Sequence, residues 1–230
     1  MDKAGRIIAE ARHPIVLAGN GVIRGHSSKA LVRFAELLNI PVATTFMAKG
    51  VNPDTHPLSL GAIGPETLDY VNREFVEADV VIAIVYDIMK YVPHTLNPNR
   101  DKKIVHVDMS PAEVDASYTV NVEVIGNITP SLEALTDRGN AHVPTRTSRF
   151  RQMRREELAQ GGQDTSFPFK PQRILADLRS SLAHDDIVIS DVGAHKVWHG
   201  APLPMLSSQH LHHLERVRRR GHCPSQRSGG

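Results

Sequence analysis

The sequence predicts an α/β fold in which a parallel sheet carries helices on both faces. Short apolar runs typical of buried strands alternate with segments whose apolar residues recur at helical spacing. The strongest run, 79–86 (DVVIAIVY), is apolar almost throughout, as in a strand buried on both faces. The chain has 230 residues and is 40% hydrophobic, which suits a globular protein. No apolar run approaches the ~18 residues of a membrane span, so we expect no membrane partner.

The predicted elements of the first unit follow one another in regular order. The predicted strands are 15–18, 41–46, 79–86, 103–108 and 122–126. The predicted helices are 27–39, 65–76 and 128–136, with a short helical turn at 111–116. Ser27 or Ser28 can cap the first of these helices, and Pro65 suits the first turn of the second. Strands separated by helices pair in parallel, so we predict one α/β domain over residues 1–137.

Residues 138–170 are polar and rich in Arg, Gly and Pro, which predicts an interdomain linker with one charged helix at about 147–159. A second α/β unit then begins, with a helix over 171–183 and a strand over 187–190. We expect this unit, 171–198, to be incomplete.

Charge changes abruptly near Trp198. Residues 1–198 hold 22 Lys and Arg against 24 Asp and Glu, whereas residues 199–230 hold five Arg, one Glu and five of the 13 His. The overall charge of +2 therefore predicts no nucleic-acid partner. A single cysteine, Cys223, excludes a disulfide framework and favours a reducing compartment, so we expect a cytoplasmic protein.

Gly19, Gly21 and Gly25 follow the first predicted strand and precede a helix. Such a loop can bring backbone N–H groups to a phosphate. The spacing G-x-G-x-x-x-G differs from the strict dinucleotide pattern, so a tight strand-to-helix turn is the favoured interpretation. Nucleotide binding by Gly19 and Gly21 remains the alternative.

Asp108 ends the predicted strand 103–108. Its carboxylate can accept a hydrogen bond from a ribose hydroxyl, or it can cap the turn at Ser110 and Pro111. The sequence favours the cap and keeps nucleotide binding as an alternative. His106, inside the strand, is interpreted as a core histidine.

The turn 191–195 (DVGAH) follows another predicted strand, and this is where α/β sheets commonly bind ligands. Gly193 permits close backbone approach, and His195 can donate a hydrogen bond to a phosphate oxygen. In the basic tail, five residues could suggest a metal site: His210, His212, His213, His222 and Cys223. Their spacing does not match the usual ligand pairs, so we predict no metal site. We also predict no catalytic residue in this chain.

Together these segments resemble the thiamine diphosphate-dependent acetolactate synthase family. The matching text is HPIVLAGNGVIRG, IPVATTFMAKGVNPDTHPLSLGAIG, EADVVIAIVYD, DKKIVHVDMSPAEVDASY, KPQRIL and DIVISDVGAHKVW, in the family's order. The match covers residues 4–198: the family's middle domain, its linker and the opening of its C-terminal cofactor domain.

The resemblance implies a homo-oligomeric enzyme that decarboxylates pyruvate and transfers the two-carbon unit to a 2-oxo acid, with thiamine diphosphate and Mg²⁺ as cofactors. It places Gly193, Ala194 and His195 beside the cofactor diphosphate. The family's activating glutamate and its Gly-Asp-Gly…Asn metal motif have no candidates in this chain. We therefore expect a fragment that is inactive alone, with a nucleotide-binding (FAD or ADP) or purely structural module as the alternative.

Some members of the family bind FAD in the middle domain. Here Val85 stands where relatives usually have Gly, and a β-branched side chain there would hinder close backbone approach. The Tyr86-Asp87 pair that follows resembles the flavin-free branch. The sequence therefore argues against FAD.

Residues 199–230 read as translation in a shifted frame. If each codon is read from its second base, His199–Pro204 can give MARLYP and Gln209–Val217 can give NTCIISNGF. Both strings resemble text that the family carries after a tryptophan equivalent to Trp198. A constant offset over both segments favours a frameshift over a functional basic tail.

Overall fold

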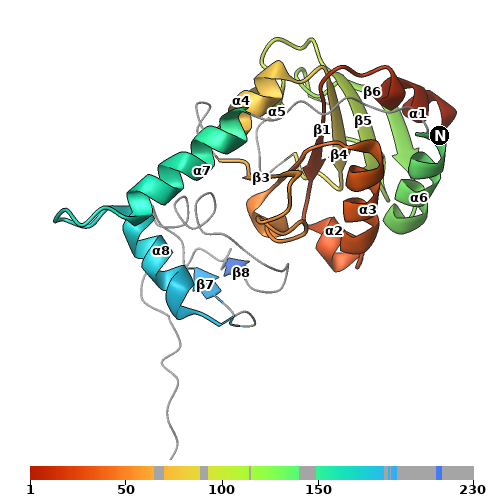
Figure 1. Cartoon of the computed structure of the whole chain (residues 1–230). Helices are drawn as coiled ribbons and strands as arrows, with labels where there is room; N and C mark the ends of the chain where they lie inside the picture. The colour runs from red at the N-terminus through yellow and green to blue at the C-terminus, as the bar shows by residue number, and fades with distance from the viewer. Residues whose placement is uncertain are drawn as a thin grey trace, which may run out of the picture.

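The computed structural model of the protein contains a six-stranded parallel sheet with helices on both faces (Figure 1), which confirms the predicted fold class. The structure describes residues 1–64, 70–88, 93–113, 115–139, 149–183, 186, 188–190 and 211–213. The strands are β1 (Pro14–Ala18), β2 (Val42–Thr44), β3 (Ser59–Ala62), β4 (Val80–Ile84), β5 (Lys103–Asp108) and β6 (Val120–Ile125). Their order across the sheet is β3-β2-β1-β4-β5-β6. Strands β2 and β3 extend the sheet on one side of β1, and β4, β5 and β6 extend it on the other side. The strand order therefore reverses between β1 and β4.

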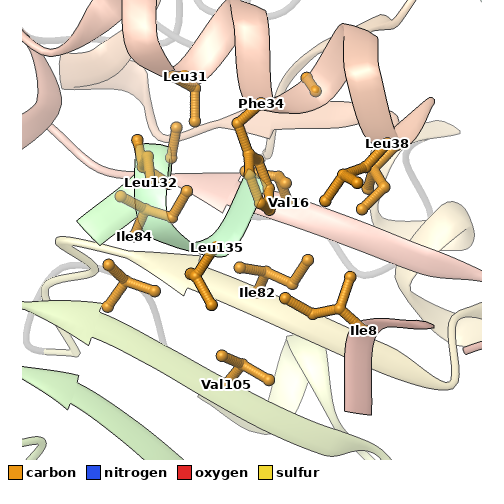
Figure 2. Packing of buried hydrophobic residues seen from close by; sticks show 14 of the residues in the cluster. Ile8, Val16, Leu31, Phe34, Leu38, Ile82, Ile84, Val105, Leu132 and Leu135 are labelled. Atoms are coloured by element: carbon orange, nitrogen blue, oxygen red, sulfur yellow. The ribbon is translucent and has the colours of Figure 1, made fainter. Parts of the chain in front are cut away.

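Helices α1 (Asp2–Ala9), α3 (Ser28–Leu38) and α6 (Ile128–Arg138) cover one face of the sheet. Leu31, Phe34 and Leu38 of α3 point from the helix toward Val16 of β1 (Figure 2). Phe34 is fully buried. Each large apolar side chain buried here stabilises the fold by roughly 1.5–3 kcal/mol. These residues recur at helical spacing in the sequence, which predicted a helix over 27–39.

The opposite face carries α4 (Tyr70–Glu77) and α5 (Pro93–Leu96). Alternate residues of β1 divide between the two cores, because successive side chains of a strand point to opposite faces. Val16 and Ala18 join the first core, whereas Ile15 and Leu17 join the second, with Phe75 of α4. Burial on both faces explains the nearly continuous apolar runs of the central strands.

Several predicted elements differ from the structure. The helical turn predicted over 111–116 is wrong, because residues 111–113 are irregular and Asp115 forms an isolated bridge with Tyr118. Side chains satisfy the backbone donors there: Glu123 Oε1 accepts from the Ala112 N–H at 2.8 Å. Strand β2 ends at Thr44, and a 3₁₀ turn (η1, Phe46–Ala48) follows where the strand was predicted to continue to residue 46. Helices α1 and α2 (Gly21–Arg24) and strand β3 were not predicted.

The predicted linker contains helix α7 (Arg149–Gly162). Residues 163–170 connect α7 to the next helix, α8 (Pro171–Ser181) (Figure 1). Beyond α8, β7 (Val188–Ser190) pairs in parallel with β8 (Leu211–His213). Strand β8 lies in the segment interpreted as frameshifted, where no strand was predicted.

Helix α7 lies against α4 and the edge strand β3. Arg151 donates from Nε to the Ser59 carbonyl at 2.8 Å and from Nη2 to the His56 carbonyl at 2.9 Å, and Arg154 Nη1 donates to the Leu60 carbonyl at 3.1 Å. Two guanidinium groups therefore donate hydrogen bonds to main-chain carbonyls of the edge strand β3. Unpaired carbonyls on an edge strand can otherwise pair with a strand of another chain. The prediction that residues 138–170 form a linker did not include this packing of α7 against residues 56–60.

Candidate functional site

A cleft of about 200 Å³ lies at the carboxyl ends of β1, β2 and β4. Its lining residues come from the segments that follow these three strands: Gly19, Asn20, Gly21, Arg24, Thr45, Met47, Val85 and Asp87. Ligands of doubly wound sheets bind outside the carboxyl ends of the strands, at the point where strand order reverses. The cleft occupies that position between β1 and β4, and we refer to it as the switch-point cleft.

Backbone hydrogen bonds hold the three strand ends in place. The Gly19 N–H donates to the Ile84 carbonyl at 2.8 Å, and the Thr45 N–H donates to the Ala18 carbonyl at 2.9 Å. A Cβ at Gly19 would lie 1.8 Å from the Val85 carbonyl oxygen. Only glycine permits this approach of β1 to β4, so Gly19 has a structural role whatever the cleft binds.

Val85 adopts an unusual backbone conformation at the end of β4. Its φ is +49°, in the left-handed region that β-branched residues rarely adopt. The Val85 N–H donates to the Val107 carbonyl at 2.9 Å, which ties the residue to β5. With this backbone, the side chain of Val85 turns over the loop after β1. A Cβ at Gly21 would lie 2.0 Å from Val85 Cγ1, so Gly21 accommodates the valine.

These contacts decide what the glycines of the loop do. In a dinucleotide-binding loop, the glycines carry no side chain, so the loop backbone can approach a pyrophosphate closely. Here the main chain of Val85 and Tyr86 covers the open face of Gly19, and the side chain of Val85 covers that of Gly21. The remaining volume of about 200 Å³ is also below the ~300–1,000 Å³ typical of small-molecule sites. The residues present therefore do not fit a dinucleotide such as FAD.

Asp108 does not line the switch-point cleft. Its Oδ1 accepts from the Met109 N–H at 2.6 Å and from the Ser110 N–H at 3.2 Å. The carboxylate thus organises the turn after β5, which agrees with the capping interpretation. Asp108 is absent from the lining of the cleft that Gly19 and Gly21 share, so this cleft does not support a nucleotide site built from all three.

His106 is buried beneath the same turn. Its Nδ1 lies 3.0 Å from the Tyr118 hydroxyl, and its Nε2 lies 3.3 Å from the Ser110 carbonyl oxygen. Burial raises the pKa of Tyr118 well above its usual range, with further contributions from Tyr86 and Asp108. Both polar side chains have partners, which is typical of a core network that fixes the loop between β5 and β6.

Lys49 is buried beside Asp54, with Nζ 3.6 Å from a carboxylate oxygen. Burial lowers the pKa of Lys49 to about 8, Asp54 opposes the shift, and Arg154 of α7 adds to it. The amide of Asn52 is buried and has no hydrogen-bond partner among the residues that the structure describes. Neither residue lines the switch-point cleft.

The sequence pointed to Gly19 and Gly21 as possible nucleotide-binding residues, and to Val85 and Asp87 as evidence against FAD. It gave no indication of Asn20, Arg24, Thr45 or Met47. The rule that ligands bind beyond the carboxyl ends of parallel strands would have found Thr45, once the strand order was known.

Gly193, Ala194 and His195 lie outside the described residues, as do His210, His222 and Cys223. Among the residues that the structure describes, no group of three or more His, Cys, Asp or Glu side chains is placed to hold a metal ion. No helix in the described ranges is long and apolar enough to cross a membrane.

Comparison with known proteins identifies the family. The family model described as the central domain of thiamine pyrophosphate enzymes matches residues 1–135. A probable acetolactate synthase large subunit of Methanocaldococcus jannaschii is 33% identical over 214 residues, which cover 85% of this chain and 35% of the relative. An acetolactate synthase of Mycobacterium bovis is 27% identical over 204 residues, which cover 85% of this chain and 33% of the relative. A glyoxylate carboligase of Escherichia coli O157:H7 is 24% identical over 219 residues, which cover 91% of this chain and 37% of the relative.

The chain spans about 35% of the length of the curated relative from M. jannaschii. Because 85% of this chain aligns with it, the similarity continues past the 135 residues that the family model matches. The family match, the parallel sheet and the acetolactate synthase relatives agree with the resemblance seen in the sequence. The chain belongs to the thiamine pyrophosphate enzyme family, and its residues 1–135 match the model of that family's central domain.

Proposed function

We propose that this chain supplies the central domain, and the opening of the cofactor domain, of an acetolactate synthase-like enzyme. The observation that carries the proposal is the match of residues 1–135 to the central-domain model, continued by relatives named acetolactate synthase over 85% of the chain. The reaction would decarboxylate pyruvate and transfer the two-carbon unit to a second 2-oxo acid. Thiamine diphosphate, when bound with Mg²⁺, supplies the carbanion chemistry of such a reaction.

In this proposal the residues of this chain serve two purposes. The six-stranded sheet is a scaffold, because its switch-point cleft is closed by Val85. Gly193, Ala194 and His195 would approach the diphosphate of the cofactor, as the resemblance implies. We propose that the enzyme assembles as a homo-oligomer in the cytoplasm, and that this chain alone forms no acetolactate from pyruvate, thiamine diphosphate and Mg²⁺.

A domain replacement tests the proposal. Residues 1–135 would replace the corresponding central domain of the M. jannaschii relative, and acetolactate would be measured from pyruvate. We expect activity within about tenfold of the unmodified relative. A chimera carrying Gly19→Val is the matched negative control, because a Cβ at Gly19 would lie 1.8 Å from the Val85 carbonyl oxygen. A chimera that folds and assembles but forms no acetolactate would overturn the proposal.

We also propose that residues 199–230 are translated out of frame. The support is the constant codon offset that recovers family-like text after Trp198. The DNA should be read across Trp198 and beyond. A shifted frame that stays open and encodes a Gly-Asp-Gly…Asn motif is the expected result. A shifted frame that closes at once would contradict it and make the basic tail genuine.

A further inference from the structure

We propose that the side chain of Val85 excludes dinucleotides from the switch-point cleft by covering the backbone of Gly21. The sheet has the order β3-β2-β1-β4-β5-β6, which is the order of dinucleotide-binding folds, with the cleft where the strand order reverses. A glycine-containing loop follows β1, as it does in those folds. The strand order therefore matches that of a dinucleotide-binding fold. The main chain of residues 85 and 86 covers Gly19, so Gly21 is the loop glycine that a side chain covers.

The obstacle can be traced to one residue. Val85 Cγ1 stands 2.0 Å from the position that a Cβ on Gly21 would take, so the valine lies in contact with the glycine backbone. Val85 Cβ lies 2.8 Å from the same position and Cγ2 lies 3.3 Å from it. The whole side chain therefore covers the face of Gly21, through which a pyrophosphate would approach the loop backbone.

The rest of the cleft is suited to a polar ligand. Arg24 and Asp87 are exposed at its rim, and Asn20 and Thr45 complete the polar part of the lining. An arginine can pair with a phosphate, and a carboxylate can accept a hydrogen bond from a ribose hydroxyl. The polar groups of a nucleotide site are present, whereas access to the glycine backbone is closed.

The left-handed conformation of Val85 explains why its removal should open the cleft without rebuilding the strand. Glycine adopts a φ of +49° at no steric cost, so Val85→Gly keeps the path of the backbone. The hydrogen bond from the residue 85 N–H to the Val107 carbonyl also remains possible, because it involves only main-chain atoms.

The test is a titration of the full 230-residue chain and its variants with FAD, NAD and ADP, followed by calorimetry and, for FAD, by fluorescence anisotropy. We expect no saturable binding by the wild-type protein up to millimolar ligand. Val85→Gly should bind at least one dinucleotide at least tenfold more tightly than the wild-type limit. Val85→Ala removes both γ-methyl groups and should give a smaller gain in the same direction.

Val122→Ala is the matched control, because it truncates a valine on β6 that does not line the cleft. It should bind as weakly as the wild type. Circular dichroism and thermal unfolding would verify that each variant is folded. Saturable micromolar binding by the wild type would overturn the proposal, as would folded Val85→Gly and Val85→Ala variants that bind no better. Neither the titration nor its result depends on acetolactate synthesis, so this inference and the proposed function can fail separately.

Discussion

Val85 Cγ1 lies 2.0 Å from the position that a Cβ on Gly21 would occupy, so the two residues form one close contact across the centre of the sheet. Gly21 begins the helix after β1, and Val85 follows β4 directly. The contact therefore joins the two halves of the sheet at the point where strand order reverses. Substitutions at the two positions should be energetically coupled.

Gly21→Ala should destabilise the wild-type protein by about 2 kcal/mol or more, because the new methyl group would overlap Val85 Cγ1. In a Val85→Ala background the same substitution should cost at least about 1 kcal/mol less. Urea denaturation of the four proteins of the cycle measures the coupling. Gly25→Ala is the control, because a Cβ there would meet the Gly21 carbonyl oxygen at 3.0 Å but not Val85. Equal costs in both backgrounds would show that the contact is absent.

At position 85 we expect glycine to be more stable than alanine, the reverse of the usual order inside a sheet. An alanine at a φ of +49° keeps the steric cost of a Cβ in the left-handed region, whereas glycine does not. The expected difference in the free energy of unfolding is about 1 kcal/mol in favour of glycine. Chemical denaturation of Val85→Gly and Val85→Ala checks the order. A more stable alanine variant would mean that residue 85 leaves this conformation.

The sequence was sufficient to predict the sheet because the central strands are buried on both faces. Strand β5 (Lys103–Asp108) was predicted with its observed bounds, and α3 differed by one residue at each end. Strand β3 was missed because it is a short edge strand that contains Gly61 at a φ of +96°, so it carries little strand signal. Helix α1 did carry a signal, since Ala4, Ile7 and Ile8 recur at helical spacing and are buried.

The site was predictable only in part. Gly19 and Gly21 were found because glycines after a strand are a local signal. Thr45 and Asp87 come from other strands, so their proximity depends on a strand order that no local pattern encodes. The left-handed backbone conformation of Val85 could not be predicted from the sequence, because no residue in the segment IVYD indicates a positive φ at the valine.

Docking of α7 should depend on Arg151 and Arg154, whose guanidinium groups donate to carbonyls of residues 56–60. Hydrogen bonds from charged donors contribute roughly 1.5–3 kcal/mol each when they are protected from water. The double variant Arg151→Ala/Arg154→Ala should therefore release α7 and expose Phe150, which is buried. Chymotrypsin should cleave after Phe150 at least about tenfold faster than in the wild type.

Arg155→Ala is the matched control for this experiment, since Arg155 is exposed on the same helix. Its cleavage rate should stay within about twofold of the wild type, as expected for a surface substitution. If the double variant is cleaved as slowly as Arg155→Ala, α7 is held by its packing on α4 rather than by the two arginines.

Stability should rise with pH above about 8 because of Lys49. Burial lowers the pKa of Lys49 to about 8, whereas the ordinary value is 10.5. Below pH 8 the folded and unfolded chains both carry the proton, and the fold bears the full cost of a buried charge. Between these two pKa values the folded chain releases the proton first, so the unfolded chain binds more protons and stability increases with pH. The increase is at most about 1.4 kcal/mol per pH unit for one proton.

Urea midpoints of the wild type and of Lys49→Met at pH 7.5, 8.5 and 9.5 isolate this contribution, because methionine does not titrate. The free energy of unfolding of the wild type should rise relative to Lys49→Met across the series. Lys29→Met, which removes an exposed lysine, should give a profile parallel to that of the wild type. The series stops at pH 9.5 because the raised pKa of Tyr118 lowers stability once the unfolded tyrosine ionises near pH 10. A flat difference between wild type and Lys49→Met would show that Lys49 keeps its ordinary pKa, and a falling difference would show that Asp54 raises it; either result would contradict the prediction.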